Sequence, residues 1–87
     1  MNTMSQDIPY CIHVTELETL PDYKLRVVFE DGKRGVYDMA HLLDQGVFRT
    51  LRDPEVFNSA WLAFGVPNWP GGIDISPERL WTDCVPV

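Results

Sequence analysis

The sequence has few basic residues, and this limits the ligands it is suited to bind. Only 7 of its 87 residues are Lys or Arg, against 13 Asp or Glu, which gives a net charge of −6. Nucleic-acid binding depends on clustered Lys and Arg side chains that displace counterions from phosphates. We therefore expect no direct nucleic-acid binding. The modest acidity is typical of an ordinary soluble surface and only secondarily of a basic protein partner.

Cysteines and long apolar runs are also scarce. Cys11 and Cys84 are too few for a disulfide framework, and isolated cysteines in a reducing compartment are usually inert, partly buried thiols, although a bridge between these two stays open. No stretch approaches the ~20 apolar residues of a membrane helix, and the N-terminus lacks the basic and apolar parts of a signal peptide. We expect a cytoplasmic protein without a membrane segment.

The length and composition predict one folded domain over residues 1–87. A chain of this length supports a single hydrophobic core. Apolar residues make up 45% of the chain and aromatic residues 11%, which is ample for a packed interior. Residues 1–7 show no pattern and are expected to be frayed.

Alternating apolar residues predict strands in the first half of the chain. The first strand is expected at residues 8–14 and the second at residues 23–29. A third follows at about 33–38, after a hairpin turn at Asp31-Gly32 of the two-residue type I′ kind, in which Val27 faces Val36. The alternative is a bulged three-residue loop with Gly32 in the left-handed conformation.

Capping residues predict three short helical segments. The expected caps, two of them followed by proline at the first helical position, are Asp38, Asp53 with Pro54, and Ser76 with Pro77. The first helix is expected to stop at Gly46, the stretch VFRTL to add another apolar turn through Phe48 and Leu51, and the second helix to run from about 54 to 60. The third is one helical turn anchored by Leu80 and Trp81.

The segment between the last two helices predicts short hairpin-forming strands. The stretch WLAFGV reads as a strand interrupted by Gly65, and Gly71 and Gly72 form a turn before Ile73. Parallel crossovers lack room. The element order therefore predicts an α+β fold, with a small antiparallel sheet with hairpins, two short helices packed on one face and a C-terminal helical turn.

Two segments, LPDYKLRVVFEDGKRGVYDMAHLLDQGVFRTLRDPEVF and NWPGGIDISPERLW, resemble the small bacterial family catalogued as domain of unknown function 2442. The shared features are an Asp-Gly hairpin, Gly-Val-x-Asp before a Leu-Leu helix, Leu-x-Asp-Pro, and a Trp-Pro-x-Gly-x-Asp ending. The resemblance runs from about residue 8 to residue 81. One departure is Gly71, where the family pattern has Asn. Both residues tolerate left-handed geometry, so the turn survives but any role of an asparagine amide is lost.

The resemblance implies a fold more than an activity, because the family has none assigned. Some members are followed by a helix-turn-helix DNA-binding domain, and others stand alone and are suspected of belonging to regulatory or toxin–antitoxin-like pairs. The sequence up to Val87 contains no such domain, so from the resemblance we expect the stand-alone form, a module that binds a partner rather than reads DNA.

Candidate catalytic residues are weak. A small enzyme or ligand-binding domain could use Asp74, Glu78 and His41 as a carboxylate–imidazole set. Ordinary roles outweigh this: Asp74 beside a tight turn accepts backbone N–H groups, Glu78 complements a helix dipole, and His41 lies on an exposed helix face. Phosphate-binding, dinucleotide and hydrolase signatures are absent from the sequence. We predict no catalytic residue.

Metal and anion sites are weaker still. Four potential zinc ligands occur in the chain, namely Cys11, His13, His41 and Cys84. Their spacing matches no zinc finger, and both chain ends would have to converge on the first helix. The pair Arg49 and Arg52 is expected to be solvated or paired with nearby acids rather than to bind an anion. We predict neither a metal nor a cofactor.

Three tryptophans are the better lead, because so short a chain can hardly bury all of them and partly exposed Trp is enriched at interfaces. The candidate partner-binding residues are Trp61, Trp69, Trp81 and Asp74. The competing interpretation is that the indoles complete a small core around the C-terminal turn. The leading hypothesis is a non-enzymatic module that acts through protein contacts, as a homodimer or as the regulatory, antitoxin-like half of a small pair.

Overall fold

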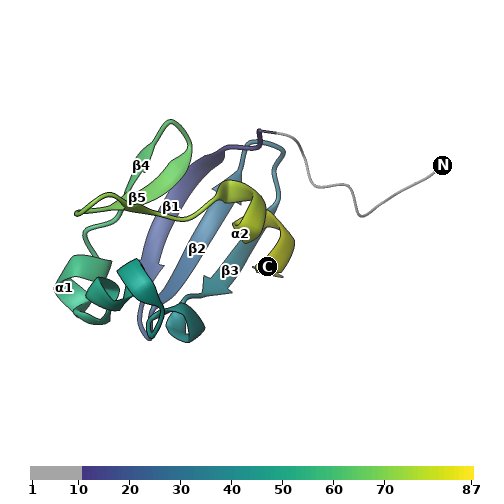
Figure 1. The fold of residues 1–87 in the computed structure, drawn as a ribbon. Helices are drawn as coiled ribbons and strands as arrows, with labels where there is room; N and C mark the ends of the chain where they lie inside the picture. The colour runs from purple at the N-terminus through teal and green to yellow at the C-terminus, as the bar shows by residue number, and fades with distance from the viewer. Residues whose placement is uncertain (1–10) are drawn as a thin grey trace.

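The computed structural model describes residues 11–87, which form two antiparallel sheets flanked by short helices (Figure 1). The four-stranded sheet has the order β1-β2-β3-β7, with β1 at Val14–Leu20, β2 at Lys24–Phe29, β3 at Arg34–Asp38 and β7 at Val85–Pro86. The three-stranded sheet has the order β4-β5-β6, with β4 at Trp61–Ala63, β5 at Val66–Trp69 and β6 at Ile73–Asp74. The predicted α+β class is confirmed, and the second sheet is a feature that the prediction of one small sheet did not include.

The helices are short and mostly follow the predicted caps. Two are 3₁₀ helices and two are α-helices: η1 at Ala40–Leu42, η2 at Gly46–Arg52, α1 at Pro54–Phe57 and α2 at Pro77–Asp83. The carboxylate of Asp53 accepts from the Glu55 N–H, and the Ser76 hydroxyl accepts from the Arg79 N–H, each at 3.0 Å. Asp38 accepts from the Ala40 N–H at 2.8 Å, but the N-cap position of η1 is Met39, one residue later than predicted. These side chains satisfy N–H groups that have no partner within a helix.

Gly46 has a different role from the predicted helix stop. Its φ of +45° is left-handed, as the prediction required, but the residue opens η2 instead of ending a single helix. The N–H of Gln45 already donates to the Leu42 carbonyl at 2.9 Å. The chain therefore leaves η1 before Gly46 and starts a second 3₁₀ helix there.

The first strand lies later in the chain than predicted. Of the predicted strand at 8–14, residues 8–10 lie outside the described part, and β1 begins at Val14. The prediction missed the rest of β1 because its outward side chains are charged: Glu16 and Glu18 alternate with half-buried Leu17. Arg26 on β2 bonds Glu18 at 2.8 Å across the ladder, which accounts for the polar face.

The β2–β3 hairpin has the bulged three-residue loop that the sequence left open as an alternative. The prediction of a two-residue type I′ turn is wrong. Val27 faces Gly35 and not Val36, which leaves a loop of three residues, 30–32. Within this loop Gly32 alone has a positive φ, of +91°. A type I turn followed by one left-handed residue needs a single glycine, whereas a type I′ turn would also force Asp31 into a positive φ.

A two-residue hairpin turn does occur, between β4 and β5. Ala63 faces Val66, so that Phe64 and Gly65 form the loop, with φ values of +53° and +77°. Positive φ at both central residues is the type I′ geometry, which matches the twist of the flanking strands. WLAFGV is therefore a hairpin instead of one interrupted strand.

The core lies between the inner face of the four-stranded sheet and the remaining elements. Its fully buried large side chains include Leu25, Phe29, Leu51, Phe57, Trp69 and Leu80. Helices η2, α1 and α2 each contribute one buried apolar residue to this set, so the short helices are stabilised by packing rather than by their length. No helix within residues 11–87 is long and apolar enough to span a bilayer.

Candidate protein-interaction site

The three tryptophans have different environments. Trp69 is 1% exposed, donates its indole N–H to the Phe57 carbonyl at 2.9 Å and lies against the Phe57 ring with centroids 6.1 Å apart. A buried indole with a satisfied N–H is a core residue. Trp69 is thus part of the interior and is unavailable to a partner.

Trp81 is half-buried and tied to the β2–β3 turn. Its N–H donates to the Asp31 carboxylate at 2.9 Å. The Lys33 ammonium lies 3.9 Å from the centroid of the Trp81 ring and donates to the Trp81 carbonyl at 2.6 Å. These contacts connect α2 to the turn, so the indole has a structural role that explains its position.

Trp61 remains half-exposed, and a second aromatic residue next to it is almost fully exposed. Trp61 is 47% exposed on β4, and Phe64 is 95% exposed at the tip of the β4–β5 hairpin. Asn68 pairs with Trp61 on one side and with Asp74 on the other, which places these three side chains on one face. The predicted contact residues Trp61 and Asp74 therefore share a face, and Phe64 extends it.

Phe64 was missed by the sequence reasoning because phenylalanine is not a residue expected in a tight turn. Asn, Asp and Gly dominate type I′ turns, since other residues are strained at positive φ. The available signal was the Phe64-Gly65 pair between two short apolar stretches in a segment without charge. Residues 56–73 contain no Asp, Glu, Lys, Arg or His, in a chain that is 23% charged.

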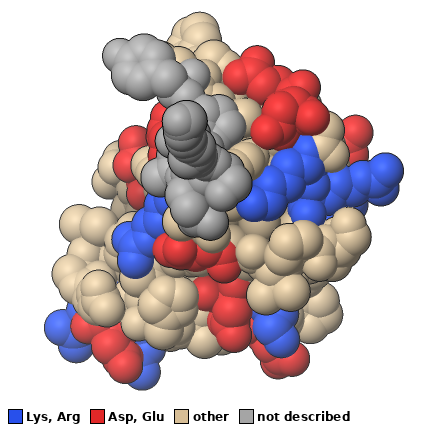
Figure 2. Space-filling view, turned by 90° about the vertical axis from the view of Figure 1, so that its right-hand side faces the viewer, with Lys and Arg blue, Asp and Glu red and all other residues tan. Residues whose placement is uncertain are grey.

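The uncharged segment contrasts with the rest of the surface. Figure 2 shows the face on the opposite side from β4 in Figure 1, and there Lys and Arg side chains are interspersed with Asp and Glu. We define the hairpin surface as the side chains of Trp61, Ala63, Phe64 and Val66, which lie on the outward side of β4 and β5 or at their turn. Asp74 lies at its rim.

The hairpin is held to the first sheet at its turn. The Gly65 carbonyl accepts from the Val14 N–H at 2.8 Å. A Cβ atom at Gly65 would lie 2.5 Å from the Cβ of His13, so the glycine also allows His13 to pack against the turn. Contacts of Gly65 with His13 and Val14, at the start of β1, therefore hold the turn that carries Phe64 in place.

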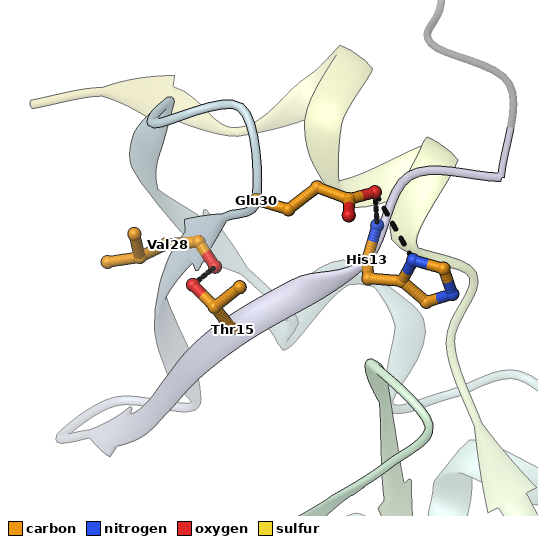
Figure 3. A network of polar contacts seen from close by, with 4 residues as sticks. All are labelled: His13, Thr15, Val28 and Glu30. Atoms are coloured by element: carbon orange, nitrogen blue, oxygen red, sulfur yellow. Dashed lines mark hydrogen bonds and ion pairs between the residues drawn. The ribbon is translucent and has the colours of Figure 1, made fainter.

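His13 is in turn held by Glu30, as Figure 3 shows. The Glu30 carboxylate accepts from the His13 backbone N–H at 3.0 Å and lies 3.2 Å from Nδ1 of the His13 ring. In the opposite direction, the Glu30 backbone N–H donates to the His13 carbonyl at 2.9 Å. Beside this pair, the Thr15 hydroxyl donates to the Val28 carbonyl at 3.2 Å at the bulge in β1. The polar network supports the turn that presents Phe64.

The residues considered for catalysis are distributed over different parts of the molecule. His41 lines an open groove of about 730 Å³ together with Lys24, Asp38 and Asp83, and neither Asp74 nor Glu78 lines it. The Tyr37 hydroxyl lies 3.4 Å from His41 Nε2 in this groove, and burial raises the pKa of Tyr37. The described lining contains no serine or cysteine to serve as a nucleophile.

The four potential zinc ligands are likewise separate. His13 pairs with Glu30, His41 contacts Tyr37, Cys11 is exposed and Cys84 is buried. Within the described part of the chain, no group of three His, Cys, Asp or Glu side chains could hold a metal ion. Of the two arginines considered for an anion site, Arg52 pairs with Asp44 at 3.7 Å.

The comparisons with known proteins identify a family. Searches of curated proteins and of solved structures found no match. A family model described as "Protein of unknown function (DUF2442)" matches residues 14–86, from the first residue of β1 to the last of β7. Because this match spans nearly the whole chain and includes both sheets, the chain belongs to the DUF2442 family.

Proposed function

We propose that this chain is a non-enzymatic cytoplasmic module that acts through protein–protein contacts, and that the hairpin surface makes the contact. The observation that carries the proposal is Phe64, a fully presented aromatic side chain on a left-handed backbone. Two free thiols, Cys11 and Cys84, are consistent with a reducing compartment.

The conformation of Phe64 is unfavourable for the isolated fold. A non-glycine residue in the left-handed region costs on the order of 1 kcal/mol or more, and a 95% exposed ring recovers almost none of this by burial. Asparagine at this position would relieve the strain without exposing a phenyl ring. Contact with another protein would give the Phe64 ring a role, because the ring does not stabilise the isolated fold.

The hairpin segment that bears Phe64 has the composition of an interface centre. Charged residues are depleted at the centres of protein interfaces and aromatic residues are enriched. Trp61 supplies a second aromatic ring on the hairpin, and residues 56–73 have no charge. The bond between Val14 and Gly65 holds the turn in place, which reduces the ordering cost of binding.

Affinity purification from the native host tests the proposal. The tagged bait is wild type, the double variant Trp61→Ser with Phe64→Asn, or the control Val47→Ser, which alters another apolar residue, 65% exposed on η2. We expect wild type and Val47→Ser to retain the same protein, either the untagged chain or another one, and the double variant to lose it. Equal recovery by the double variant, or no recovery by wild type, would contradict the proposal.

A further inference from the structure

A second apolar feature of the surface matches the hairpin in chemistry. A pocket of about 250 Å³ lies between the β1–β2 turn and α1, and its apolar walls come from Leu20, Pro21, Tyr23, Pro54 and Phe57. The Tyr23 and Phe57 rings meet edge to face with centroids 5.3 Å apart. The Tyr23 hydroxyl donates to the Arg52 carbonyl, so the pocket presents the ring of Tyr23 and not a free hydroxyl.

We infer that this pocket receives Phe64 of a second copy of the chain, so that two copies form a closed dimer with two reciprocal contacts. This inference rests on the proposed role of the hairpin surface. The pocket is large enough for a phenyl ring, and an aromatic ring packs favourably against aromatic and proline walls. Asp22 is the single charged residue of its described lining.

The position of the two features suits a twofold arrangement. Figure 1 shows the turn between β4 and β5 at the top of the fold and α1 at its lower left, so the two features are well separated. In the inferred dimer two copies lie antiparallel, so that the β4–β5 turn of each copy meets the α1 of the other copy. Such a closed, isologous contact uses the same patch on both copies.

The lack of charge on the hairpin segment favours a second copy of the chain over a basic protein as the partner. A basic partner would be recognised by several acidic side chains around the anchor, but the segment 56–73 that bears Phe64 is uncharged and Asp74 lies only at the rim of the hairpin surface. The uncharged hairpin segment can meet a pocket whose described lining has one charge, Asp22, although each chain carries −6, and salt screens the remaining repulsion. Association is therefore expected to strengthen between low and moderate salt, the opposite of a contact made by ion pairs.

Sedimentation equilibrium on the purified full chain tests the inference with two pairs of variants. Phe64→Asn removes the ring and leaves the pocket open. Asn58→Trp fills the pocket mouth and leaves the ring in place, since Asn58 is an exposed lining residue, and Asn58→Ala is its matched control. We expect wild type and Asn58→Ala to dimerise, and Phe64→Asn and Asn58→Trp each to weaken dimerisation by about 30-fold or more.

A mixture of the two defective variants makes the test specific. Phe64→Asn supplies an open pocket and Asn58→Trp supplies the ring, so a mixed dimer regains one contact and must form more tightly than either variant alone. A monomeric wild type, a dimer unaffected by Phe64→Asn, growth into longer chains, or a mixture no tighter than its parts would each overturn the inference. If wild type is monomeric and a bait still captures another protein through Phe64, the proposed function stands without the dimer.

Discussion

The indole N–H of Trp81 donates to the carboxylate of Asp31 at 2.9 Å, across 50 positions of the chain. The other oxygen of Asp31 accepts from the Lys33 N–H at 3.0 Å, and the Lys33 ammonium lies over the Trp81 ring. One carboxylate therefore shapes the β2–β3 turn and connects it to α2. The aspartate of the Asp-Gly pair acts through these bonds and not through a positive φ.

Replacing Trp81 with Phe should lower the free energy of unfolding by about 1 kcal/mol, because it removes an N–H donor to a charged acceptor at a partly exposed site. Urea unfolding measures the loss. In a double-mutant cycle with Asp31→Ala the two effects should be less than additive. Strict additivity would mean that the bond between Trp81 and Asp31 contributes nothing.

Gly32→Val should destabilise the fold by more than about 1 kcal/mol through backbone strain alone. Gly32 has a φ of +91°, and a Cβ atom there would contact nothing within 4 Å, so the expected cost comes from the backbone conformation and not from a clash of Cβ. Gly32→Asn is the matched control, since asparagine tolerates left-handed geometry better, and it should cost less. Equal urea midpoints for the two variants would rule out strain as the cause.

The two thiols should differ in reactivity. Cys84 is buried, and burial raises the pKa of its thiol, so it has little thiolate near neutral pH, whereas Cys11 is exposed. Labelling of the native protein with a thiol reagent, followed by mass spectrometry, should modify Cys11 first and Cys84 only when the fold opens. Equal rates would contradict the burial of Cys84.

The same shift sets a direction for stability at alkaline pH. The Cys84 thiol ionises at its ordinary pKa in the unfolded chain and at a higher pKa in the folded one. The neutral Cys84 thiol therefore makes its full contribution to the free energy of unfolding below the ordinary thiol pKa. This contribution is lost as the pH rises through the pKa of Cys84 in the folded protein. Cys84→Ala should flatten the decline in unfolding free energy over that alkaline range, and an unchanged slope would argue against the shift.

The sequence predicts the helices whose first turn is stabilised by residues next to it in the chain. Asp53-Pro54 and Ser76-Pro77 begin α1 and α2, because a side-chain acceptor followed by proline satisfies a helix start without distant contacts. The β2–β3 register was harder, since the same Asp-Gly pair fits a two-residue or a three-residue loop. Packing decides it, because the observed register places Tyr37 beside Leu25 on the buried face.

The candidate site depended on information that the sequence does not hold locally. Three tryptophans looked equivalent along the chain, but contact with Phe57 buries Trp69 and the bond to Asp31 holds Trp81, which leaves Trp61. Phe64 looked like a strand residue because propensity places phenylalanine in strands. Its turn becomes evident only once Ala63 is seen to face Val66.

The most direct test of the hairpin surface is one variant, Phe64→Asn, measured for both stability and association. If Phe64 is kept for contact at the expense of the fold, the variant should unfold at higher urea than wild type at protein concentrations low enough to keep both monomeric, because dimerisation would itself stabilise wild type. The expected gain is on the order of 1 kcal/mol, because asparagine is favoured ahead of glycine in a type I′ turn. The same variant should lose the association that wild type shows by sedimentation or affinity purification. A variant that is less stable than wild type, or equally able to associate, would contradict the account.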